Sequence, residues 1–284
     1  MVGVLDVGSN SVRLLIRDNG ATLYKNNIIT QLAKDFDGKL LSIYSINRTV
    51  EALVYFINLA KERKCEKVFA FGTEALRKAD NSGILLSKVK EQTGVEIKII
   101  SGEEEAELGL LGVLMGNDGG IIDIGGASTE ITISKDKKTI YSHSLDVGVV
   151  RLFDICGDSE SKLEEYTKNK IKEYKKVPLA TMYGIGGTIT SVASMLQELL
   201  EYDANKINGY VITKGNLLKL KEKIFSLKLE ERKNIIGIQE KRAKVIAGGV
   251  VLLLNIMDYL NIDNLIASDN DNLEGFLIKE KLYD

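Results

Sequence analysis

The chain contains the stretch LDVGSNS at residues 5–11, and a second copy of it, IDIGGAS, stands at residues 122–128. In each copy a short apolar run ends in an aspartate, and a glycine-containing turn with a hydroxyl residue follows. The next residues, VRLLI at 12–16 and TEITI at 129–133, have the period of two that is typical of a β-strand. Each copy therefore predicts a β-hairpin with an acidic residue just before a tip of small residues.

This layout differs from the better-known phosphate loops. A P-loop needs a lysine followed by a helix, and a dinucleotide-binding fingerprint opens a helix with G-x-G-x-x-G. Here a strand follows the turn in both copies. A hairpin tip of small residues lets phosphate oxygens approach backbone N–H groups closely, and an aspartate beside it can hold a hydrated metal ion. The repeat thus predicts two phosphate-binding tips.

Strand-like and helix-like segments alternate along both halves of the chain, which indicates an α/β fold. The segment Asp118-Gly119-Gly120 interrupts the pattern just before the second copy. We expect a first domain over residues 1–117 and a second over 118–284, with the C-terminal helix able to pack back on the first. Helices are predicted at Asn47–Lys64, Ser82–Gly94, Glu103–Met115, Ser159–Lys176 and Lys214–Asn234, and further strands at Lys67–Phe71 and Glu96–Ile100.

Bulk composition excludes several classes of protein. The 284 residues include 38 basic and 40 acidic side chains, a balance that gives no support for nucleic-acid binding. The two cysteines, Cys65 and Cys156, are too few for a disulfide framework, and we expect buried thiols in a reducing compartment. The longest apolar run, 245–254, is shorter than the ~20 residues that a membrane span needs, and no leader peptide is apparent. These features predict a cytoplasmic protein with no nucleic-acid or membrane partner.

Three further segments place polar or small residues where ligand sites form in open α/β sheets. They are GTEALR at 72–77, SGEEEA at 101–106 and GIGGT at 184–188. Each has an ordinary explanation as well, because glycine turns are common and acidic residues stabilise any helix N-terminus. The single histidine, His143, is expected in a strand and without a catalytic role. The joint occurrence of these segments with the two tips is what points to a phosphate site.

Taken together, these segments resemble the exopolyphosphatase/guanosine pentaphosphate phosphohydrolase (Ppx/GppA) family. That family belongs to the superfamily of sugar and acetate kinases, actin and the actin-like heat-shock chaperones. The resemblance implies duplicated actin-like (ribonuclease H-like) α/β domains with mixed sheets and an active site in the cleft between them. The matching strings are DVGSNS at 6–11, TEALR at 73–77 with Ala79 and Asn81, ISGEEEAE at 100–107, IDIGGASTE at 122–130, GVVRL at 148–152, GIGGT at 184–188, residues 242–249 and Glu274-Gly275.

The resemblance also implies a role for individual residues. Glu105 resembles the catalytic base that activates water, and Arg77 resembles an arginine that reaches the substrate's phosphates. Asp123 resembles the carboxylate of a Mg²⁺ site, with Mn²⁺ as an alternative metal, and Asp6 a supporting acid near that metal. The implied phosphate contacts are Gly8, Asn10, Ser11, Gly125, Gly126, Ser128, Gly186, Gly187 and Thr188.

The implied activity is metal-dependent release of the terminal phosphate from inorganic polyphosphate or guanosine pentaphosphate. Phosphoryl transfer to water needs charge neutralisation, in-line positioning and a group that orients the water, and the residues above can supply all three. Members of the family are often dimers, so a homodimer is expected. Two alternatives stay open: a kinase of the sugar or acetate type, and an inactive regulator of the same superfamily that binds nucleotide or polyphosphate.

The chain departs from the family pattern in three places. Ala127 stands where the family has the third glycine of the second tip, and its Cβ is expected to narrow the approach of phosphate. Phe71-Gly72-Thr73-Glu74 replaces the usual Ala-Thr-Ser, and Leu273 stands where an arginine usually precedes Glu274-Gly275. Longer members carry a further helical domain, and this chain resembles the short form. For that form we expect short polyanions or a nucleotide pentaphosphate as substrate.

Overall fold

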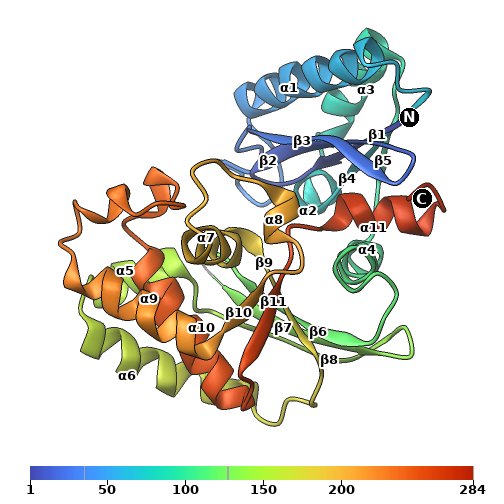
Figure 1. Ribbon diagram of the computed structural model, residues 1–284. Coiled ribbons are helices and arrows are strands. Elements are labelled where there is room, and N and C mark those ends of the chain that lie inside the picture. The colour runs from blue at the N-terminus through green and yellow to red at the C-terminus, as the bar shows by residue number, and fades with distance from the viewer. Residues whose placement is uncertain (35, 127, 284) are drawn as a thin grey trace. The chain divides into compact units, whose positions relative to one another are not determined.

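The computed structural model describes residues 1–34, 36–126 and 128–283 (Figure 1). The chain divides into two compact units, each built on one β-sheet. Unit 1 combines Met1–Met115 with the C-terminal residues from Asp271 onward, and unit 2 is Gly116–Asn270. The division after Met115 lies two residues from the boundary that the sequence suggested, and the C-terminal helix belongs to unit 1.

Unit 1 is organised by a five-stranded mixed sheet in the order β3-β2-β1-β4-β5. Its first three strands are consecutive antiparallel neighbours, and β4 and β5 continue the sheet in parallel with β1. The strands are β1 (Val2–Val7), β2 (Ser11–Asp18), β3 (Ala21–Ile29), β4 (Lys67–Gly72) and β5 (Ile97–Ile99), and the helices are α1 (Ile43–Glu62), α2 (Glu74–Lys78), α3 (Ser82–Thr93), α4 (Gly102–Leu114) and α11 (Asn272–Lys279).

Both faces of this sheet are covered. Alternate side chains of β1 and β2 point to opposite faces, so Leu14 and Ile16 pack in one apolar cluster with α1 and α3. Leu15 points the other way, into a second cluster that contains Leu108 of α4 and Leu273 of α11. Because α4 and α11 share this face, the segment that contains Glu105 is packed against the C-terminal helix.

Unit 2 has a six-stranded mixed sheet in the order β10-β11-β9-β6-β7-β8. A single apolar cluster, to which α10 contributes most of its length, forms its core. The strands are β6 (Gly119–Ile124), β7 (Thr129–Lys135), β8 (Lys138–Leu145), β9 (Met182–Ile185), β10 (Val211–Thr213) and β11 (Asn264–Ala267). The helices are α5 (Val149–Cys156), α6 (Glu160–Lys170), α7 (Gly186–Leu196), α8 (Ala204–Ile207), α9 (Lys214–Ser226) and α10 (Ile246–Leu260), with 3₁₀ turns at Ile171–Tyr174, Arg232–Asn234 and Glu240–Arg242.

The two sheets repeat one topology. Strands β6, β7, β8, β9 and β11 pair in the same order and with the same directions as β1 to β5, and β10 adds one antiparallel strand at the edge. The predicted α/β fold of duplicated actin-like, mixed-sheet domains is therefore confirmed, and the internal sequence repeat marks the first hairpin of each copy.

Two predicted helices are too long, and the helix expected over Asn47–Lys64 begins four residues earlier, at Ile43. The helix expected over Lys214–Asn234 ends at Ser226, because Arg232 folds back and donates from Nε to the Ile224 carbonyl at 2.9 Å while its guanidinium pairs with Asp158. The α-helix expected over Ser159–Lys176 ends at Lys170, and a 3₁₀ turn follows up to Tyr174. Tyr174 is buried, and its hydroxyl donates to the Thr129 carbonyl at 2.8 Å. In both cases a tertiary contact ends a helix that local sequence would continue.

The two cysteines and the histidine occupy structural positions. Cys65 and Cys156 are both free thiols; Cys156 is buried, and Cys65 is only partly so. His143 lies in β8, where its ring stacks near Tyr141. Across the residues that the structure describes, no helix combines the length and the apolar character that crossing a bilayer requires.

Helices α4 and α11 approach each other so closely that glycine is required on both. A Cβ added to Gly275 would lie 1.8 Å from the Leu108 carbonyl oxygen, and one added to Gly112 would lie 2.0 Å from that of Asp271. Neither contact is with a flexible side chain, so the backbone itself would have to move. The pair of glycines therefore fixes how α11 docks on the helix that carries Glu105.

Replacement of Gly275 by alanine is expected to lower the free energy of unfolding by roughly 1–3 kcal/mol or more, because the added methyl group meets backbone atoms. Gly83→Ala in α3 is the matched control, since a Cβ there meets nothing within 4 Å. The control is expected to be neutral or to stabilise by about 0.4–1 kcal/mol. Urea unfolding of both variants measures the difference, and equal midpoints would contradict the proposed packing constraint.

Candidate functional site

The two predicted hairpin tips form with the same geometry. The Gly8 N–H donates to the Ser11 carbonyl at 3.0 Å, and the Gly125 N–H donates to the Ser128 carbonyl at 3.0 Å. A side chain on either glycine would crowd that carbonyl, at 3.3 Å and 3.2 Å respectively. Asn10, Gly126 and the two serines thus belong to the tips, as the sequence predicted. Ala127 lies outside the described residues, so its expected effect on phosphate approach stays a prediction.

The strand that follows each tip gives its aspartate a charged neighbour. In the first hairpin Asp6 stands directly opposite Arg13, and in the second Asp123 stands directly opposite Glu130. Residues that face each other across an antiparallel pair lie on the same side of the sheet, within reach of one another. The aspartate of the first tip therefore faces a positively charged side chain, and the aspartate of the second tip faces another carboxylate. Like charges directly opposite each other repel, and the Glu130 carboxylate is held by Ser144 Oγ on β8, which donates to its Oε1 at 2.6 Å.

Asp6 is completely buried, and its Oδ2 forms an ion pair with Nη2 of Arg13. Burial raises the pKa of Asp6 to about 6, because the low-dielectric surroundings outweigh the opposite pull of Arg13. Within the described part of the chain, the other carboxylate oxygen, Oδ1, has no hydrogen-bond partner. Buried acceptors are rarely left unsatisfied, so Oδ1 is suited to accept from a bound water or ligand.

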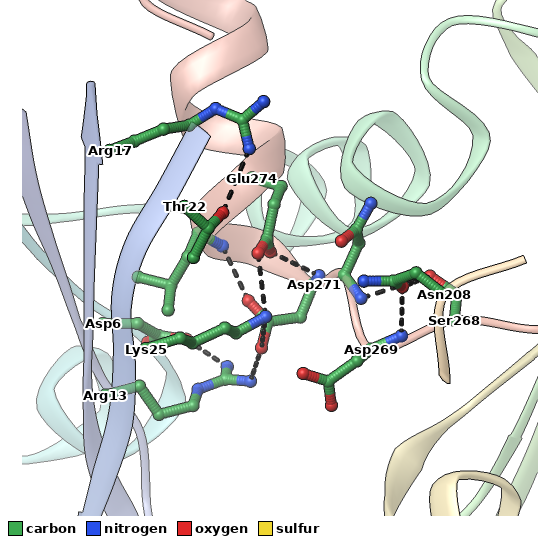
Figure 2. Close-up of polar contacts among 12 residues, drawn as sticks. Asp6, Arg13, Arg17, Thr22, Lys25, Asn208, Ser268, Asp269, Asp271 and Glu274 are labelled. Atoms are coloured by element: carbon green, nitrogen blue, oxygen red, sulfur yellow. Dashed lines mark hydrogen bonds and ion pairs between the residues drawn. The ribbon is translucent and has the colours of Figure 1, made fainter. Parts of the chain in front are cut away.

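Arg13 belongs to a larger cluster of charges in unit 1 (Figure 2). Its Nη1 donates to Oδ2 of Asp271 at 2.6 Å, and Lys25 donates to Glu274 at 2.8 Å. Burial acts to raise the pKa of Asp271, but the positive charges of Arg13 and Lys25 outweigh it and hold that pKa below its ordinary value. Burial and the neighbouring Asp271 carboxylate raise the pKa of Glu274 to about 7. The cluster thus joins β1, β2 and β3 to the start of α11.

Glu105 and Arg77 are brought together in unit 1. Arg77 lies on α2, and its Nη1 and Nη2 both reach Oε2 of Glu105 at 3.3 Å. Nη1 also donates to the Ile100 carbonyl at 2.7 Å, which holds the guanidinium at the end of β5. Both side chains of the pair are 31% exposed, so the arginine is accessible to solvent.

The N-terminal turn of α4 presents Glu105 in a defined direction. Ser101 caps the helix by accepting from the Glu104 N–H at 3.0 Å, and three glutamates occupy the first turn. Thr73, the residue before α2, donates from its N–H to the Val7 carbonyl at 3.2 Å. This contact ties the element that carries Arg77 to the strand that carries Asp6. The first tip, Arg77 and Glu105 therefore lie in one region of unit 1.

Asp123 is packed against the start of α7 in unit 2. Gly186 has a left-handed φ of +81°, and a Cβ there would lie 2.4 Å from Oδ1 of Asp123. Thr188 donates from Oγ1 to the Ile124 carbonyl at 3.1 Å, which joins α7 to the end of β6. The carboxylate, the second tip and the N-terminus of α7 therefore form one group. A helix N-terminus offers backbone N–H groups and a positive dipole end to an anion.

Two further contacts shape this part of unit 2. The first N–H groups of α5, from Val149 and Val150, donate to the Gly125 and Gly126 carbonyls at 3.0 and 2.9 Å and hold the tip backbone in place. The guanidinium of Arg242 lies directly over Gly187, where an added Cβ would come within 1.8 Å of Nη2. Burial lowers the pKa of Arg242 from its ordinary value, although arginine keeps its charge at neutral pH.

Three charged residues beside the predicted site residues, Glu130, Arg13 and Arg242, have no role predicted from the sequence, although Glu130 and Arg242 lie in strings that match the family. The first two occupy the same place in the two copies, seven residues after each aspartate, so the hairpin register could have revealed them. Arg242 lies far along the chain from Gly187, and local sequence carries no signal of their contact.

A magnesium ion fits the acids of the second tip better than the first. Over the described ranges, no cluster of three or more histidine, cysteine, aspartate or glutamate side chains has the arrangement of a metal cage. Mg²⁺ in phosphoryl-transfer sites is usually held by one or two carboxylates together with substrate phosphates and water. Asp123 provides such a carboxylate, with Glu130 opposite it on β7, whereas Arg13 already neutralises Asp6. The assignment of Asp123 and Asp6 to a metal stays a prediction, as does the expected cleft between the domains.

These features define an actin-like α/β protein with two glycine-containing hairpin tips, each preceded by an aspartate. The model of the Ppx/GppA phosphatase family matches residues 21–284, and the chain therefore belongs to that family. The crystal structure of the type II variant of the Aquifex aeolicus Ppx/GppA phosphatase is similar, with a TM-score of 0.86 and 31% identity over 98% of both chains.

Curated relatives match nearly the whole chain but differ in their own length. Exopolyphosphatase 2 of Mycobacterium tuberculosis is 28% identical over 98% of this chain and 97% of its own. A bifunctional 3-dehydroquinate synthase/phosphatase of Fusobacterium nucleatum subsp. nucleatum is 30% identical over 97% of this chain but only 46% of its own. A guanosine-5'-triphosphate,3'-diphosphate pyrophosphatase of Photobacterium profundum is 27% identical over 98% of this chain and 58% of its own.

Proposed function

We propose that this protein is a phosphohydrolase that releases the terminal phosphate from inorganic polyphosphate or guanosine pentaphosphate in a Mg²⁺-dependent reaction. The observation that carries the proposal is the group in unit 2, where Asp123, a glycine-rich tip and the N-terminus of α7 come together beside Arg242. Family membership and the names of the relatives support the same class of reaction.

The second tip and the start of α7 are the proposed binding groups for the transferred phosphoryl group. Backbone N–H groups at the tip and at Gly187 and Thr188 bind the phosphoryl oxygens, and the guanidinium of Arg242 adds a fixed positive charge. Asp123 and Glu130 would hold Mg²⁺, which when bound supplies Lewis-acid stabilisation of the charge that develops on the phosphoryl group. The binding groups are fixed before substrate arrives, because α5 and α7 hold the tip backbone.

Glu105 is the general base of the proposed reaction. Glu105 accepts the proton of the attacking water, and its carboxylate is held at the start of α4 by Arg77. A phosphate group of the substrate competes with Glu105 for this arginine, since guanidinium binds carboxylate and phosphate in the same bidentate way. Binding of substrate to Arg77 therefore frees Glu105 to take a proton from water. The base becomes available only when a phosphate occupies the site.

Both proposed substrates end in a phosphoanhydride, and the described residues recognise phosphate rather than the rest of either molecule. The names of the relatives divide in the same way between polyphosphate and a guanosine nucleotide. A cytoplasmic location and a homodimeric state stay predictions from the sequence.

A phosphate-release assay tests the activity and its substrate together. Purified protein is mixed with short polyphosphate, long polyphosphate or guanosine pentaphosphate, each with Mg²⁺, with Mn²⁺ or with EDTA. We expect release from at least one substrate with Mg²⁺, and its loss in EDTA. Absence of release from all three would leave the binding-protein alternative, and release only after addition of an acceptor would indicate a kinase.

Replacement of Glu105 by glutamine tests the base. The amide keeps the shape of the side chain but cannot take a proton, so kcat is expected to fall by ~10²–10⁴-fold. Glu103→Gln is the matched control, because Glu103 is an exposed glutamate in the same helical turn. The control is expected to retain wild-type kcat. Full activity of Glu105→Gln, with an unchanged melting temperature, would exclude Glu105 as the base.

A further inference from the structure

Arg13 bridges two carboxylates that come from opposite ends of the chain. Nη2 pairs with Oδ2 of Asp6 on β1, and Nη1 donates to Oδ2 of Asp271 at 2.6 Å (Figure 2). The two acids are separated by most of the sequence, and the planar guanidinium joins them through neighbouring nitrogens. Because the guanidinium group of Arg13 is planar and rigid, the position of one carboxylate constrains the position of the other.

Asp271 is fixed in turn by the first turn of α11. Its Oδ1 accepts from the Leu273 N–H at 2.9 Å, and its own N–H donates to Glu274 at 2.8 Å, so the two residues form a capping box. Lys25 on β3 lies 2.8 Å from Glu274 and 3.7 Å from Asp271. Leu273 and Leu277 are fully buried against the sheet, which anchors the helix.

Asp6, at the other end of the bridge, needs this support. Its side chain is 1% exposed, whereas that of Arg13 is 30% exposed and reaches solvent. Without Asp271, the ion pair with Asp6 is the direct charged contact of Arg13 that remains among the described residues, with Glu274 nearby. If Arg13 leaves, Asp6 becomes a buried acid without a counter-charge and changes its conformation or draws in water. Oδ1 would then lose its fixed direction.

We propose that Arg13 and Asp271 are positioning residues that hold Asp6 Oδ1 in place as a hydrogen-bond acceptor for a water in the phosphohydrolase site. The inference rests on the proposed function. It assigns a role in the reaction to the C-terminal helix, which lies outside every segment predicted to contact phosphate. Asp271 also caps α11, but its direct contact with the Asp6 side is through Arg13, so in this proposal its effect on Asp6 passes through the guanidinium.

A double-mutant cycle in kcat tests this dependence. Arg13→Gln and Asp271→Asn are each expected to lower kcat by ~10–10²-fold through misplacement of Asp6, with little change in KM. The double variant is expected to lose no more than the more impaired of the two single variants, because both changes break one chain of contacts. Arg13→Lys keeps the charge but not the fork and is expected to fall between wild type and Arg13→Gln.

The matched control is Glu107→Gln, which removes another ion pair between α11 and α4, that of Glu107 with Lys279 at 2.7 Å, without touching Arg13. It is expected to leave kcat unchanged. Independent losses that multiply in the double variant, or an equal loss in the control, would overturn the proposal in favour of a merely structural role for α11.

A crystal structure of Asp271→Asn provides a readout that does not depend on activity. We expect Arg13 turned toward solvent and Asp6 in a changed rotamer, with α11 still docked through its apolar residues. Unmoved Arg13 and Asp6 would overturn the positioning claim even if the enzyme were impaired. If instead the wild-type protein releases no phosphate from any substrate, the proposed function fails, while this structure still decides whether Asp271 positions Asp6.

Discussion

The same hydrogen bond occurs in both halves of the protein, from a glycine N–H to a serine carbonyl across the hairpin tip, and it constrains the residues around each tip. It brings the serine carbonyl so close to Gly8 or Gly125 that a side chain there would crowd it. It also sets the strand register, so that the aspartate two residues before the glycine faces the residue seven positions later. The same tip thus produces an acid–base pair at Asp6 and Arg13 and an acid–acid pair at Asp123 and Glu130. The two hairpins differ in the residue that faces the aspartate. Arg13 neutralises the buried Asp6, whereas Glu130 leaves a second acid beside the partly exposed Asp123.

Much of the fold follows from local sequence. The repeated tips and the alternation of strands with helices predict an α/β fold with a repeated hairpin. The resemblance to the Ppx/GppA family implies two duplicated domains with mixed sheets, and the structure confirms this fold. Helix ends were predicted less well. Arg232 shows why, since its side chain pairs with Asp158 and stops α9 at a place where the local sequence still favours a helix. No pattern within a window of neighbouring residues reports such a contact.

The predicted site residues form two groups, one in unit 1 and one in unit 2, as their order in the sequence suggests. The contacts that support each group come from residues far along the chain. Arg242 covers Gly187, and Asp271 reaches Arg13 across nearly the whole sequence. The position of α11 on unit 1 depends on Gly112 and Gly275, whose importance lies in the space between two helices rather than in any local turn. Arg13 and Glu130 are different, because the register of a tight hairpin is encoded locally and places each of them opposite its aspartate.

The proposed mechanism depends most on water being the acceptor of the phosphoryl group, with attack at the terminal phosphorus. Reaction in ¹⁸O-labelled water, followed by mass spectrometry of the released phosphate, measures this directly. The mechanism predicts that each phosphate released in a single turnover carries one ¹⁸O atom, and that the shortened substrate carries none. Released phosphate without label, or label found only on the remaining chain or nucleotide, would contradict it.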